Sequence, residues 1–153
     1  MVQKITPNLW FNHNAQEAVD YYVSVFPNSK IQNTVYYPKG KEEGLADFQM
    51  DLAGAVLSID FELDGVAFTA INAGPEFAFT EAVSFAIVCK DQEEIDYYWE
   101  KLSSVSESEQ CGWCKDKFGL SWQVVPKEMG ELMKRRDAFK HMMKMKKIVI
   151  ADF

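Results

Sequence analysis

Hydrophobic and polar positions along the chain form two similar series, each of which predicts a strand followed by a helix. Residues 16–22, QEAVDYY, reappear as residues 92–98, QEEIDYY, at an offset of 76 residues. In both copies the apolar side chains recur at helical spacing. Each copy starts with a capping-box pattern, Asn14 with Glu17 and Asp91 with Glu94. A short β-prone run, residues 5–11 or 83–89, precedes each helix.

The remainder of the first half predicts three further strands. Residues 30–37 are rich in aromatic and β-branched side chains, and residues 57–63 alternate strictly between apolar and polar. The Asp64-Gly65 pair then predicts a hairpin turn into a returning strand, residues 66–71. Between these strands, residues 40–54 predict a long loop with one or two helical turns that use Leu45, Phe48 and Leu52. The first half is therefore expected to be β-α-β-β-β.

The second half is compatible with the same order, although residues 105–110 show no clear pattern. Residues 64–69 align with residues 118–123 at the smaller offset of 54, because the loop in the first half is longer. We therefore predict an α+β fold in which modules 1–78 and 79–126 form one domain, 1–126, of curved mixed sheets with helices outside. Residues 127–153 are predicted to be a basic helical tail.

Composition narrows the class of protein. The 153 residues, 48% of them hydrophobic, suit one domain with an ordinary core. No uncharged run is long enough to span a bilayer, and the N-terminus lacks a signal-peptide pattern, so we expect a cytoplasmic protein without a membrane partner.

Charge divides the chain unevenly. The net charge of −7 combines 8 basic and 19 acidic groups in residues 1–126, or −11, with 8 basic and 3 acidic groups in residues 127–147, or +5, and one further acid, Asp152. An acidic body argues against nucleic-acid binding, which needs a positive surface. The tail is instead expected to dock on an acidic surface of this chain or of a partner.

The cysteines are too few for a secreted disulfide framework. Cys111 and Cys114 spell C-x-x-C, a spacing that also occurs in redox pairs and zinc sites. Residues 115–119 read as a turn, however, and a strand ending at Cys114 would direct these two side chains to opposite faces. We therefore expect reduced thiols.

Conventional catalytic signals are weak. His13 and His141 have no carboxylate or nucleophile nearby in the sequence, and both are predicted at the surface. Asp60, Glu62 and Asp64 form a row that we interpret as a solvated face, although carboxylates facing inward could serve as a general base or metal ligands. Nucleophile elbows, P-loops and H-E-x-x-H are absent from the sequence.

Several strings of residues resemble a known family. They are residues 26–31, 72–77, 82–85, 92–94, 99–102 and 111–123, the last of which includes Phe-Gly-x-Ser-Trp-Gln. They are similar to the PhnB-like branch of the vicinal-oxygen-chelate superfamily, which comprises glyoxalases, bleomycin-resistance proteins and extradiol dioxygenases. Members are often labelled 3-demethylubiquinone-9 3-methyltransferase. The sequence argues against that activity for this chain, because its eight glycines never form the G-x-G of a nucleotide-binding turn.

The resemblance also implies where a ligand would bind. Metal-using relatives hold a divalent ion through side chains of the first and last strand of each half, and these positions fall on Asn8, Thr69, Ser84 and Gln123. Since amides and hydroxyls replace the usual imidazoles and carboxylates, we predict no metal and no cofactor. The four are expected to line a ligand cavity with Trp10, or alternatively to satisfy one another in a collapsed one.

The sequence thus leads to one preferred hypothesis and two alternatives. We expect a small organic ligand in a metal-poor cavity of a protein that forms a homodimer. A metal-dependent lyase, isomerase or dioxygenase of the same superfamily is the first alternative, and an antibiotic-sequestering resistance protein is the second.

Overall fold

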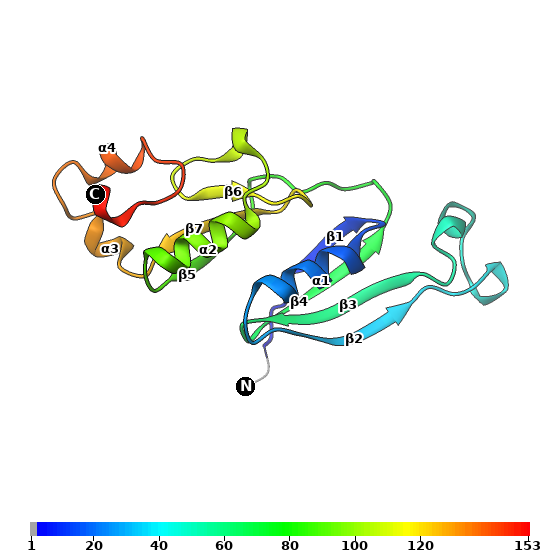
Figure 1. Ribbon diagram of the computed structural model, residues 1–153. Coiled ribbons are helices and arrows are strands. Elements are labelled where there is room, and N and C mark those ends of the chain that lie inside the picture. Colours follow the sequence, from blue (N-terminus) through cyan, green and yellow to red (C-terminus); the bar gives the residue numbers. More distant parts are fainter. Residues whose placement is uncertain (1–2) are drawn as a thin grey trace. The chain divides into compact units, whose positions relative to one another are not determined.

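The computed structural model describes residues 3–153 and divides the chain into two compact units, Met1–Ala78 and Phe79–Phe153. Each unit combines one mixed sheet with one long helix, which confirms the predicted α+β class (Figure 1). The finer division into a domain of residues 1–126 and a tail remains a prediction. Across residues 3–153 no helix has both the length and the apolar character needed to cross a membrane.

The first unit contains the predicted β-α-β-β-β order. Its four-stranded sheet has the order β1-β4-β3-β2, in which β1 and β4 are parallel and the other neighbours are antiparallel. The elements are β1 (Asn8–Asn12), α1 (Ala15–Val25), β2 (Lys30–Tyr36), β3 (Val56–Leu63) and β4 (Val66–Ala73).

The core of this unit lies between the sheet and α1. Ile59, Phe61 and Leu63 alternate along β3 and are at most 5% exposed, as the strict period of two predicted. Phe61 stacks on Phe68 of β4 with ring centroids 5.5 Å apart. Because alternate side chains project from opposite faces, Asp60, Thr69 and their neighbours lie on the face directed away from α1.

The long loop between β2 and β3 folds into two short 3-10 helices, η1 (Lys41–Glu43) and η2 (Asp47–Leu52). Leu45 and Leu52 are buried against Tyr37 and Leu57, so the expected helical turns and two of their three anchors are confirmed. Phe48 is the exception, because its side chain is 78% exposed. The loop thus has a small hydrophobic core of its own.

The second unit has a shorter sheet than the repeat predicted. Its order is β5-β7-β6, with β5 and β7 parallel and β6 antiparallel to β7. Residues 103–109 comprise six serines and glutamates and one apolar residue, Val105. They cannot offer an apolar strand face, so the expected fourth strand does not form. The elements are β5 (Ser84–Cys89), α2 (Gln92–Leu102), η3 (Ser106–Ser108), β6 (Trp113–Lys115), β7 (Ser121–Pro126), α3 (Met129–Leu132), α4 (Ala138–Met142) and η4 (Ile150–Asp152).

A buried carboxylate organises the turn before β7. Asp116 is 1% exposed, and its Oδ1 accepts hydrogen bonds from the backbone N–H groups of Phe118 (2.8 Å) and Leu120 (3.0 Å). Its Oδ2 accepts one from the indole Nε1 of Trp122 at 2.8 Å. Three donors thus compensate the buried charge. This arrangement explains structurally why an aspartate precedes the Phe-Gly-x-Ser-Trp-Gln string.

The basic tail docks on α2 of its own unit. Gln92 donates to the carbonyl of Ile148 and accepts from the N–H of Ile150, both at 2.9 Å, while Lys147 pairs with Asp96 at 2.7 Å. One contact of the predicted kind, between a lysine of the tail and an acidic side chain of α2, is therefore present within the chain. Instead of one helix, however, the tail forms the short helices α3, α4 and η4.

Candidate functional site

The polar residues expected at the ligand site of the first unit are direct neighbours. Asn8 of β1 lies opposite Thr69 of β4 in the parallel ladder. The Thr69 hydroxyl donates to Oδ1 of Asp60 at 2.7 Å, and Nδ2 of Asn8 donates to the carbonyl of Thr6 at 3.0 Å. Thr6, Asp60 and Thr69 line an open, polar cavity of about 390 Å³. The carboxylate row thus contributes Asp60 to this cavity.

The corresponding pair in the second unit is also in contact. Nε2 of Gln123 donates to the Ser84 hydroxyl at 2.9 Å. In the ladder, however, Ser84 lies opposite Ser121, and Gln123 lies opposite Ala86. Ser121 is therefore the positional equivalent of Thr69, two residues before the one that the sequence alignment selects. A shift of two preserves the face, which is why Gln123 still reaches Ser84.

These four positions do not fit a divalent metal. Asn8 and Gln123 offer neutral amide oxygens and Thr69 and Ser84 offer neutral hydroxyls, so the set contains no carboxylate, thiolate or imidazole ligand. Among residues 3–153, moreover, no three side chains of His, Cys, Asp or Glu are grouped closely enough to hold a metal ion. The donor chemistry favours hydrogen bonding to an organic molecule over coordination.

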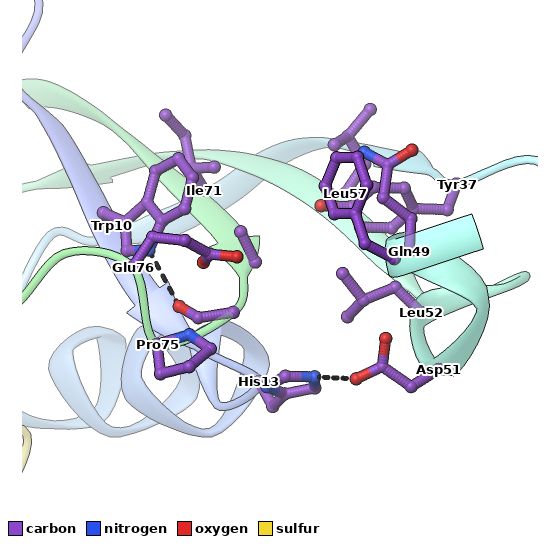
Figure 2. A pocket seen from close by; sticks show the side chains of 13 residues that line it. Trp10, His13, Tyr37, Gln49, Asp51, Leu52, Leu57, Ile71, Pro75 and Glu76 are labelled. Atoms are coloured by element: carbon purple, nitrogen blue, oxygen red, sulfur yellow. Dashed lines mark hydrogen bonds and ion pairs between the residues drawn. The ribbon is translucent and has the colours of Figure 1, made fainter. Parts of the chain in front are cut away.

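A better formed pocket lies at the carboxyl ends of β1 and β4, within the first unit. Its volume is about 300 Å³, and η2 forms its opposite wall. Figure 2 shows two groups of side chains facing each other across it, with Trp10 and Glu76 on one side and Tyr37 and Gln49 on the other. Of the five predicted ligand-binding residues, Trp10 alone lines this pocket.

Trp10 is held firmly in the wall of the pocket. Its indole Nε1 donates to the carbonyl of Gly74 at 2.9 Å, and its ring meets that of Phe77 edge to face, with centroids 4.8 Å apart. Gly74 also leaves room for the carboxylate of Glu76, since a Cβ at this position would lie 2.7 Å from Glu76 Oε2. Residues 74–76 therefore form one side of the pocket, and Phe77 packs against Trp10 beside them.

Asn72 fixes this segment to the rest of the module. It is 6% exposed, its Oδ1 accepts from the N–H of Ala15 at 3.1 Å, and its Nδ2 donates to the carbonyl of Val56 at 2.9 Å. Its backbone carbonyl accepts from the hydroxyl of Tyr37 at 2.6 Å. One side chain thus ties the start of α1 to β3 and β4. Since residues 72–77 are one of the strings that carry the family resemblance, that string encodes the pocket wall.

His13 has a partner that its sequence neighbourhood does not reveal. Its Nε2 lies 2.7 Å from Oδ2 of Asp51 in η2, and its Nδ1 lies 2.6 Å from Oδ1 of Asn12. The His13 side chain is 42% exposed, so it lies partly at the surface, as predicted, but it also lines the pocket. The pair links the turn after β1 to η2 across 38 residues of sequence.

The surroundings of Tyr37 raise the pKa of its hydroxyl group. Burial raises the pKa of its phenol, and the nearby carboxylates of Glu76 and Asp51 raise it further. The phenol therefore stays protonated at neutral pH and donates to Asn72. The same effect shows that the two acidic side chains act on one small region.

Sequence reasoning missed Tyr37, Glu76 and the His13–Asp51 pair. A sequence signal that points to this loop is the difference between the two repeat offsets, 76 − 54 = 22 residues, which becomes 76 − 52 = 24 when Ser121 is taken as the equivalent of Thr69. It indicates a longer loop in the first half but does not point to Glu76. An insertion of that length in only one module is typical of a functional loop. In the structure this insertion supplies η2 and hence one wall of the pocket.

Comparison with known proteins supports the resemblance noted from the sequence. A family model described as 3-demethylubiquinone-9 3-methyltransferase matches residues 3–125. A PhnB protein from Bacillus cereus with the same description is 34% identical, covers 81% of this chain and 99% of its own, and has a TM-score of 0.63. Protein PA1353 from Pseudomonas aeruginosa, 18% identical over 82% of this chain and 98% of its own, shares the fold with a TM-score of 0.60. No curated protein matches.

Proposed function

The chain belongs to the family described as 3-demethylubiquinone-9 3-methyltransferase, and from this premise we propose that it binds a small organic molecule in the pocket between Trp10 and η2. The observation that carries the proposal is the construction of residues 72–77, which are held by hydrogen bonds to Trp10 and Ala15 and of which residues 73–76 line a cavity of about 300 Å³. That volume lies at the lower end of the range typical of small-molecule sites, roughly 300–1,000 Å³.

The composition of the pocket lining also supports binding. Apolar side chains such as Leu52, Leu57 and Ile71 supply contact area, while a few polar groups, including Gln49 and Glu76, can orient a ligand. The Trp10 indole and the Asn72 side chain are already held by hydrogen bonds. A preorganised wall favours affinity because little conformational freedom is lost when the ligand arrives.

The proposal concerns binding and names no reaction. A methyl transfer, as in the family's description, would need S-adenosylmethionine, and no glycine-rich turn of the usual kind is available to hold it. The neutral donors at Asn8 and Gln123 equally give no basis for a metal-dependent step. We therefore place the protein among ligand binders of its family.

A thermal-shift screen of small organic molecules, with S-adenosylmethionine and divalent cations included, tests this function. A ligand at about 100 times its Kd should stabilise the folded protein by about 2.7 kcal/mol. Trp10→Phe removes the hydrogen bond to Gly74 and part of the wall, so it should lose most of the stabilisation. Trp113→Phe is the matched control, because Trp113 is also half-buried but lies in the second unit and does not line the pocket. Equal stabilisation of both variants would contradict the proposed site.

We also propose that the protein is a homodimer. Large apolar side chains such as Phe48 and Phe77 are 78% and 65% exposed in the single chain. Exposed apolar surface favours association with a second copy, because contact would remove that surface from water. Light scattering at micromolar concentration should give twice the 17.5 kDa mass of one chain. A single species of monomer mass would refute the dimer without affecting the binding proposal.

A further inference from the structure

The pocket contains a solvent-exposed carboxylate, that of Glu76. Glu76 makes no hydrogen bond or ion pair with any of the residues 3–153 that the structure describes. Figure 2 shows its carboxylate on the same side of the pocket as Trp10, and it lies close to Gly74. A charge in this position is available to a ligand.

Gly74 permits this placement. The Glu76 carboxylate lies over the α-carbon of Gly74, where any Cβ would be 2.7 Å and 2.9 Å from its two oxygens. The backbone of Gly74 has an ordinary negative φ, so no turn geometry requires glycine here. The absence of a side chain at Gly74 therefore serves to keep the Glu76 carboxylate against the pocket wall.

The other titratable groups around the pocket leave its net charge negative. They are Tyr37, whose hydroxyl donates a hydrogen bond to the Asn72 carbonyl, and the His13–Asp51 pair, which cannot supply more positive than negative charge. None of the described residues that line the pocket is a lysine or an arginine. Residues 1–78 as a whole hold 4 lysines, no arginine and 10 acidic side chains, a net charge of −6. Both the pocket and the field around it attract cations.

A cationic ligand in this pocket would contact aromatic side chains as well as the Glu76 carboxylate. Trp10 and Phe48 line the same cavity, and a cation near the face of an aromatic ring is stabilised by the ring quadrupole. A bare metal ion does not fit, because no three metal-ligating side chains are grouped anywhere in residues 3–153. The apolar lining instead matches a molecule with a hydrocarbon or aromatic body.

We propose that the ligand of this pocket is an organic cation, a protonated amine or a quaternary ammonium group on an aromatic or apolar body, with Glu76 as its charge partner and Trp10 as its aromatic wall. The inference rests on the proposed binding function and adds the class of ligand. It makes Glu76 a residue that determines specificity.

Two indole compounds of matched size test the charge preference. Tryptamine and tryptophol share an indole ring and an ethyl chain, and they differ in ending with an ammonium or a hydroxyl group. Titration calorimetry on the full-length protein should give a lower Kd for tryptamine, by about fivefold from a partly exposed ion pair and a ring contact. The difference should shrink in high salt, which screens charges.

Glu76→Gln should bring the two Kd values together, mainly by weakening tryptamine. Glu42→Gln is the control, since it removes the same charge from η1, outside the pocket, and should leave the preference unchanged. If both compounds bind the wild type equally, the charge preference is refuted while the binding function stands. If neither compound binds although the thermal-shift screen finds other ligands in the pocket, the cation proposal is refuted as well. A preference that survives in Glu76→Gln would refute the role of that residue.

Discussion

Replacing Asn72 with alanine tests how the pocket wall is held. The substitution removes the acceptor of the Ala15 N–H and the donor to the Val56 carbonyl, and it leaves both backbone groups without these partners. Ala15 is fully buried, so water cannot readily replace the lost acceptor. An orphaned buried donor costs about 1–3 kcal/mol and the second hydrogen bond about 0.5–1.5 kcal/mol, so we expect a loss of about 1.5–4.5 kcal/mol in the free energy of unfolding.

Urea unfolding followed by circular dichroism measures this loss. Asn33→Ala is the matched control, because Asn33 is an exposed asparagine on β2 of the same unit and makes no side-chain hydrogen bond with the described residues. It should change the free energy of unfolding by less than about 0.5 kcal/mol. If Asn72→Ala stays within the same limit, the hydrogen bonds of Asn72 do not hold the wall, and the argument for a preorganised pocket fails.

Three further predictions concern the second unit. Gly112→Ala should destabilise it by about 2–4 kcal/mol in urea unfolding, because Gly112 has φ +88° and a Cβ would lie 2.9 Å from a backbone oxygen of β7. An unchanged free energy of unfolding would contradict this geometry. Asp116→Ala should cost about 3 kcal/mol in the same assay and shift the indole N–H resonance of its tryptophan partner, and an unshifted resonance would argue against the buried contact. Burial raises the pKa of the Cys89 and Cys114 thiols to about 12. At pH 8 Ellman's reagent should therefore modify only Cys111 in the folded protein. Rapid modification of all three thiols would contradict the burial of Cys89 and Cys114.

The features that could be predicted from the sequence are those that local pattern determines. The strand and helix at the start of each half follow from the repeat, and the contact of Gln123 with Ser84 follows from alternation on neighbouring strands. Residues 105–110 could not be assigned, since they lack the apolar alternation of a strand, and they form η3 and a single bridge between Gln110 and Trp113. The tail was expected to dock, but its division into short helices depends on contacts such as that of Gln92 with Ile148.

Most of the pocket could not be predicted, because its walls meet only after the long loop folds back. Trp10 was recognised because it shares a strand face with Asn8. The approach of Asp51 to His13 depends instead on where Leu52 packs, which no local pattern reveals. The importance of Glu76 depends on the room above Gly74, a property of the backbone that appears only in three dimensions.

The most direct test of the central claim is a two-dimensional NMR titration that follows the four tryptophan indole N–H resonances as tryptamine is added. The Trp10 resonance is a specific probe, since its N–H donates to Gly74 in the pocket wall. The account predicts that this resonance shifts in a saturable way, while those of Trp99, Trp113 and Trp122 stay unchanged. Saturable binding that leaves the Trp10 resonance in place would contradict the assignment of this pocket as the ligand site.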